Sequence, residues 1–134
     1  MKNLPIYLLL FIGIIFSQQT SHLLSTDVRI RVVDENLLYV VIQIDNDSGR
    51  PVRELEGYVT EIDLYSNIIT EQKLFHHHEY EPPLESGQSS VRGITYPVDL
   101  SKSHTFEYHI SRIKFENDSR TYMFTPSEGL LRID

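Results

Sequence analysis

Three consecutive histidines, His76 to His78, are the residues of this sequence best suited to chemistry. In an extended strand, side chains two positions apart share a face, so His76 and His78 would lie roughly 7 Å apart and could bind one zinc ion. A third ligand would come from His104 or His109. The alternative is an exposed polar strand end, which we favour because a tripeptide lacks the fixed spacing of a metal motif. We therefore expect no cofactor, with zinc at these four histidines as the site to test.

Other patterns give less support for a ligand or for catalysis. The segment 45–49, Asp-Asn-Asp-Ser-Gly, resembles a calcium loop only faintly, because glycine and arginine stand at its fifth and sixth positions; turn chemistry accounts for it. Ser89 and Ser90 could be drawn into a hydrolase triad with the histidines, but serines are ordinary after a glycine loop. The sequence contains no Gly-x-Ser-x-Gly, His-Glu-x-x-His or phosphate-binding glycine motif. We expect a protein that is not an enzyme, with a cryptic hydrolase as an alternative.

Composition excludes several classes of protein. The 134 residues include no cysteine and no tryptophan, which excludes a disulfide framework, a thiolate metal site and a cysteine nucleophile. Twelve basic and 19 acidic residues give a net charge of −7, the opposite of the field that nucleic-acid binding needs. The length allows one domain with a core of its own.

The N-terminus has the pattern of an export signal. Lys2 precedes an apolar run at 4–16, and polar residues follow at 17–22. The run is shorter than the roughly 20 residues that span a bilayer, so it fits a signal peptide cleaved after Ser17. The alternative is an uncleaved anchor, the only membrane contact that we expect. We predict a signal peptide at 1–17, a flexible segment at 18–26 and a β-sandwich at 27–134, in a secreted or periplasmic protein.

Apolar and polar residues alternate through almost all of the mature chain, which is typical of strands with one buried face. Turn residues separate about seven such segments, which predicts an all-β, antiparallel, immunoglobulin-like sandwich. Gly57 indicates a bulge or a close backbone approach, and a change of apolar parity between Ile110 and Ile113 predicts a bulge near Ser111. The expected strands are 28–32, 38–45, 52–65, 68–75, 91–98, 105–115 and 122–125, with a return to the sheet at 130–133. The expected core residues are Val40, Ile42, Val59, Ile62, Leu64, Phe106, Tyr108 and Ile110.

The segment 38–95 resembles the FxLYD-type domains of bacterial envelope proteins. Those domains have an Asn-x-(Ser/Gly)-x-x-Pro-Val turn, a strand ending in a Leu-Tyr-Asp-like motif and a later Leu-x-x-Gly-x-Ser loop. Here Ile62 replaces the family's phenylalanine and Ser66 its aspartate. The resemblance implies an immunoglobulin-like fold and no shared catalytic site. The matching residues are Asn46, Ser48, Gly49, Pro51 and Val52 in the turn, Leu64 and Tyr65 in the motif, and Leu84, Gly87 and Ser89 in the loop.

These observations favour a non-catalytic module that binds another exported or envelope protein. The sheet edges of a sandwich are available for strand addition. We expect the strand from Ile68 to Phe75 to be such an edge, with Ile69 and Phe75 as side-chain anchors. A periplasmic metal-binding protein is the main alternative.

Overall fold

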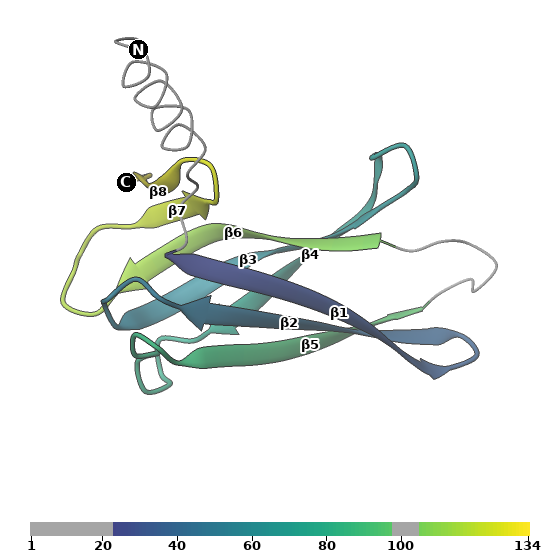
Figure 1. Ribbon diagram of the computed structural model, residues 1–134, viewed down its shortest axis with the longest axis horizontal. Coiled ribbons are helices and arrows are strands. Elements are labelled where there is room, and N and C mark those ends of the chain that lie inside the picture. The colour runs from purple at the N-terminus through teal and green to yellow at the C-terminus, as the bar shows by residue number, and fades with distance from the viewer. Residues whose placement is uncertain (1–22, 98–104) are drawn as a thin grey trace, which may run out of the picture.

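The computed structural model describes residues 23–97 and 105–134. The expected signal peptide and cleavage site lie outside the described residues, as does His104. The described chain forms two antiparallel sheets that pack face to face, so the expectation of an all-β sandwich is confirmed (Figure 1). The three-stranded sheet has the order β1 (Leu24–Asp34), β2 (Leu37–Asn46), β5 (Ser89–Pro97). The five-stranded sheet has the order β4 (Ile68–His77), β3 (Val52–Ile62), β6 (Thr105–Phe115), β7 (Tyr122–Thr125), β8 (Gly129–Arg132).

The two sheets meet over a core built from alternate residues of each strand. In β2, every second side chain from Leu38 to Ile44 is buried, as the alternation predicts. Val59 of β3 and Phe106, Tyr108 and Ile110 of β6 complete the central layer. Six of the eight expected core residues are therefore buried.

Two bulges shape the β3–β6 pair. Glu56 pairs with Arg112 while Gly57 pairs with Ile110, so Ser111 is the extra residue, as predicted. Gly57 lies where the strands approach most closely: a Cβ there would overlap the carbonyl oxygen of His109 and lie 2.7 Å from Cζ of Tyr108. Only glycine fits this position.

The structure corrects the expected ends of several elements. β1 begins at Leu24, which is buried, so residues 24–26 belong to the sheet and not to a flexible segment. The return of the chain at 129–132 is an eighth strand, which pairs with β7. Ile62 is only half-buried, at the last position of β3.

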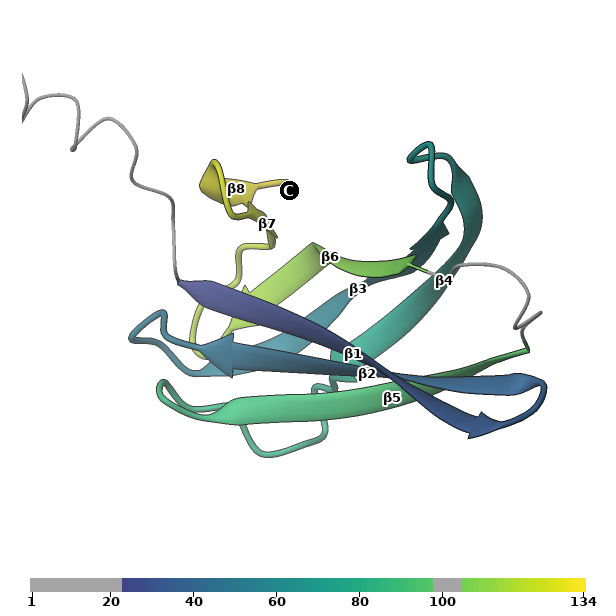
Figure 2. The same cartoon turned by 45° about the vertical axis from the view of Figure 1, so that its right-hand side comes forward.

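Leu64 is not a core residue, because β3 ends before it. Its side chain is 81% exposed and that of Tyr65 is 85% exposed, both in the turn between β3 and β4. Asp63 closes this turn by accepting hydrogen bonds from the main-chain N–H groups of Tyr65 and Asn67. Figure 2 shows the β3–β4 hairpin extending beyond the body of the sandwich.

Candidate functional site

The histidine segment lies at a bulge in the β3–β4 pair, which decides where each imidazole points. Leu55 pairs with His77 and Glu56 pairs with Phe75, so His76 is an extra residue on β4. Nε2 of His76 lies 2.8 Å from the carbonyl oxygen of Ile42, across the core on the other sheet. His77 lies opposite Leu55 and is also buried. The bulge therefore turns two consecutive histidines inward.

His78 lies on the opposite, outer face of the sheet. Its ring stacks on that of Phe75, with 5.3 Å between centroids, and on that of Tyr80, with 4.9 Å. Nζ of Lys73 also lies over the ring of Phe75, 5.1 Å from its centroid. The expectation that His76 and His78 share a face is therefore wrong, because the bulge breaks the alternation between them.

Among the described residues, the structure does not bring the expected zinc ligands His76, His78 and His109 together. His109 is an exposed residue of β6, and its Nε2 lies 3.2 Å from Oε2 of Glu107. Within residues 23–97 and 105–134, no group of three histidine, aspartate or glutamate side chains is arranged to hold a metal ion. The histidines that are described have separate environments.

Burial controls the protonation of His76. Its side chain is fully buried, and desolvation lowers its pKa from 6.5 to about 4 against the hydrogen bond to Ile42, which raises it. The charges of Arg92 and His77 lower the pKa further. His76 is thus neutral near pH 7, and donation to the Ile42 carbonyl places its proton on Nε2. Nδ1 is buried and has no hydrogen-bond partner among the described residues.

The serines near the histidines have other partners. Ser89 Oγ donates to Oδ1 of Asp45 at 2.5 Å, and this bond helps to hold the pKa of Asp45 below its usual value, after the larger effect of Gln43. Ser90 Oγ donates to the main-chain oxygen of His76 and not to its imidazole. This geometry does not assemble the serine–histidine pair of a hydrolase.

Glu54 and Glu56 of β3 form ion pairs with neighbouring strands and are not a solvated face. Glu54 accepts a hydrogen bond from Arg112 at 3.0 Å, and Oε1 of Glu56 lies 3.5 Å from Nζ of Lys73. Both glutamates are buried beneath these partners. Their carboxylates therefore act as structural ion pairs across three strands.

The turn and the later loop that carry the family resemblance contact each other through Asn46. Its Nδ2 donates to the carbonyl oxygens of Arg50 and Leu84, and its Oδ1 accepts from the main-chain N–H and the hydroxyl of Ser48. The main-chain oxygen of Asn46 accepts from the N–H of Gly87. The side chain thus serves the backbone of both loops, which explains the asparagine without a calcium ion.

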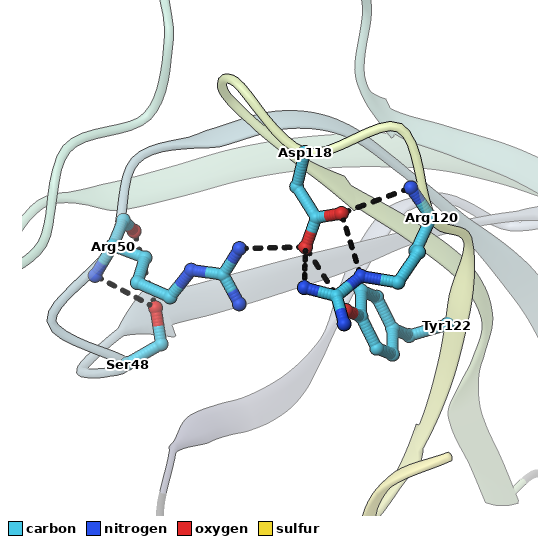
Figure 3. A network of polar contacts seen from close by, with 5 residues as sticks. All are labelled: Ser48, Arg50, Asp118, Arg120 and Tyr122. Atoms are coloured by element: carbon cyan, nitrogen blue, oxygen red, sulfur yellow. Dashed lines mark hydrogen bonds and ion pairs between the residues drawn. The ribbon is translucent and has the colours of Figure 1, made fainter. Parts of the chain in front are cut away.

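Asp118 joins this end of the sandwich to the C-terminal hairpin (Figure 3). Its carboxylate accepts hydrogen bonds from Arg50, Arg120 and the Tyr122 hydroxyl, and its side chain is 7% exposed. The bond from Arg120, followed by that from Arg50, holds the pKa of Asp118 far below its usual value. Sequence reasoning identified both turns but not this pairing, because no local pattern links residues 68 positions apart.

The expected docking edge is present and largely exposed. β4 is the outer strand of its sheet, and every residue from Ile68 to Lys73 is exposed. Ile69 is an extra residue at a further irregularity of the β3–β4 register and is 53% exposed. Phe75 is half-buried against His78 and Lys73, so it is covered by this chain's own side chains.

A cleft of about 750 Å³ opens between β1, β6 and β7. β7 pairs with β6 only at Tyr122 and Ile113 within the described residues, and the two strands then diverge. The lining is mainly apolar. The cleft is lined on β1 by Leu24 to Thr26 and Val28, on β6 by Phe106 to Ile110, and by Met123 to Pro126.

In the part of the chain that is described, no helix has the length and apolar character to cross a membrane.

Comparison with known proteins identifies the fold. No protein-family model and no curated protein sequence matches this chain. The sandwich is similar to a solved structure. It is the crystal structure of a Bordetella pertussis protein provisionally named ApaA, which matches with a TM-score of 0.53 and 13% identity over 87% of this chain and 90% of that chain. A structural-genomics target, SoR45, matches 69% of this chain and 80% of that chain with a TM-score of 0.32 and 14% identity. At this identity the likeness to the Bordetella protein concerns the fold alone.

Proposed function

We propose that this protein is an exported, non-catalytic β-sandwich module that binds another exported or envelope protein through the edge of β4. The observation that carries the proposal is the β3–β4 hairpin, which extends beyond the sandwich and exposes large apolar side chains on an outer strand. Exposed apolar groups that gather on one projection are typical of contact sites. These side chains are Leu64, Tyr65, Ile68 and Ile69, exposed by 81%, 85%, 63% and 53%.

Strand addition is the binding mode that fits this edge. The outer side of β4 offers main-chain donors and acceptors to a partner strand, and Ile69 would give the contact an apolar anchor. Phe75 becomes a secondary anchor, because a partner must first displace His78 or Lys73 from its ring. The immunoglobulin-like class and the FxLYD resemblance are part of this proposal. The strand order supports the immunoglobulin-like class, because successive strands change sheet between β2 and β3 and again between β4 and β5.

Substitution at the edge tests the proposal. The partner is first captured by crosslinking in the native envelope, and its affinity for the purified full chain is then measured. Ile69→Lys should weaken binding at least tenfold, about 1.4 kcal/mol, because it places a charge at an apolar contact. Ser127→Lys, the same change of charge on an exposed turn between β7 and β8, is the matched control and should bind as the unchanged protein does. Equal affinity for the Ile69→Lys protein would refute the β4 edge.

Export is tested separately at the N-terminus. The apolar run at 4–16 and the small residue Ser17 support a signal peptide cleaved before Gln18. Mass spectrometry of the protein from its native host should find Gln18 as the first residue. An intact Met1 would contradict cleavage and support a retained anchor.

A further inference from the structure

β1 is another outer strand, at one side of the three-stranded sheet, and it is more exposed than the opposite outer strand β5. Within the described residues β1 pairs only with β2, so the other side of its backbone is not part of a ladder. From Arg29 to Asp34 every residue is exposed, on both faces of the strand. Ile30 is 44% exposed, Val32 is 61% exposed and Val33 is 54% exposed.

Such an edge is normally protected. Proline, lysine, an early bulge or a covering loop usually prevents a long apolar edge from pairing with another chain. The 11 residues of β1 contain neither proline nor lysine, and their register with β2 is regular as far as Val32. The main-chain N–H and C=O groups on the outer side of β1 are therefore available to an added strand.

The charged side chains of this edge are Arg29 and Arg31 together with Asp27 and Asp34, so the strand as a whole is neutral. Arg29 and Arg31 lie on the outer face of the sheet, opposite Val41 and Tyr39 of β2. Arg29 is engaged, with Nε 3.2 Å from Oδ2 of Asp27 and a further hydrogen bond to Gln43. Arg31 makes no ion pair or hydrogen bond through its guanidinium within the described residues. A hollow of about 400 Å³ lies between the two arginines, lined by Arg29, Ile30, Arg31 and Val41.

We propose that the free edge of β1 binds an extended acidic peptide of a partner protein as an added strand. Main-chain hydrogen bonds would supply the register, and a carboxylate placed opposite Arg31 would form a charge-assisted pair on the outer face. Alternate apolar residues of the peptide would cover Ile30 and Val32 on the other face. Arg31, which no carboxylate of the described residues pairs with, is the group that gives this edge its preference for a partner carboxylate. This site is separate from the β4 edge and does not depend on export.

A second copy of this chain fits the edge less well in the register centred on Ile30. Two β1 strands that pair antiparallel about Ile30 place Arg29 of each copy opposite Arg31 of the other, which brings like charges together. The charge pattern that disfavours a symmetric pair favours a strand with carboxylates.

Three labelled peptides test the proposal by fluorescence anisotropy with the full chain. The first alternates glutamate and valine over eight residues, the second replaces each glutamate with lysine, and the third is the first with N-methyl groups on every second residue. The glutamate peptide should bind saturably and at least tenfold more tightly than the other two. The lysine peptide removes the charge match, and the methylated peptide removes the main-chain bonds but keeps the charges. The proposal would be overturned if the lysine peptide or the methylated peptide bound as tightly as the glutamate peptide. It would also be overturned if the glutamate peptide did not saturate at millimolar concentration.

Substitutions assign the site on the protein. Arg31→Glu should weaken the glutamate peptide at least tenfold, and Arg31→Lys should weaken it less. Arg132→Glu, an equal charge change on β8, and Ile69→Lys, on the β4 edge, should leave its affinity unchanged. Unchanged circular dichroism and melting temperature would exclude misfolding as the cause. If Arg132→Glu weakens the peptide as much as Arg31→Glu does, net charge alone attracts the peptide. If the protein forms a stable dimer that excludes the peptide, the edge serves self-association. Either result refutes the proposal.

Discussion

His76 is the residue whose chemistry depends most on the fold. Its imidazole donates across the core to the Ile42 carbonyl and leaves Nδ1 buried without a partner among the described residues. A second proton would have to occupy that nitrogen in an apolar interior, near the charge of Arg92. The hydrogen bond of the neutral ring therefore connects one sheet to the other. The charged ring would bury a second N–H group with no acceptor among the described residues.

Acidification should destabilise the protein through His76. The unfolded chain takes up the proton near pH 6.5 and the folded chain only near pH 4, so the free energy of unfolding falls as pH drops through this interval. We expect a loss of about 2 kcal/mol between pH 7 and pH 5, a range above the titration of the carboxylates. Urea unfolding at several pH values measures it.

A matched pair of substitutions isolates this effect. His76→Gln keeps a side-chain donor that does not titrate, so it should remove most of the pH dependence, whereas His109→Gln at an exposed site should keep it. NMR titration of the unchanged protein gives a second measure, with a midpoint for His76 near pH 4. A midpoint near 6.5 would show that the ring is solvated and the assignment wrong.

At the scale of the strand, bulges separate what the sequence predicts from what it does not. The bulge at Ser111 is predictable, because apolar residues change parity from Ile110 to Ile113 and only an extra residue keeps both in the core. The bulge at His76 leaves no such trace, since an aromatic ring and three imidazoles follow one another and each tolerates either face. For this reason His76 and His78, two of the expected zinc ligands, do not share a face.

Glycine in β3 gives a test of the β3–β6 register. Gly57→Ala should cost about 2–3 kcal/mol, because the new methyl group meets the fixed carbonyl of His109. Gly93→Ala is the control: its obstacle is the Tyr39 ring, a side chain on the outer face that can move. Urea unfolding should therefore rank Gly57→Ala as the more damaging change, and the reverse order would show that the close approach at Gly57 is misplaced.

At the scale of the whole molecule, alternation predicts the sandwich but not the ends of its strands. Leu64 continues the alternation of Ile62, which pairs with the exposed Thr105 and not with the core face of β6. It also lies in a turn, because Asp63 accepts hydrogen bonds from the following N–H groups and the ladder ends. Ile42→Ala should cost roughly 2–5 kcal/mol, since the side chain is fully buried, whereas Leu64→Ala should change the free energy of unfolding by less than about 0.5 kcal/mol. Similar costs for the two changes would place Leu64 in the core.

The candidate interaction edge was predictable because proline, charge and turn residues bound one apolar strand, and β4 is indeed an outer strand. The exposure of the whole hairpin was not predictable, because it depends on how far β3 and β4 extend past the facing sheet. The bond between Arg50 and Asp118 likewise joins residues 68 positions apart and has no local signature. Long-range packing therefore supplies the parts of the surface that a single sequence cannot.

Site-specific photocrosslinking in the native host tests the central claim most directly. A photoreactive amino acid at position 69 samples the β4 edge, and the same group at position 128 samples an exposed turn away from it. Binding through the β4 edge should give one discrete adduct with an exported protein from position 69 and none from position 128. Free monomer from position 69, or the same adducts from both positions, would contradict it.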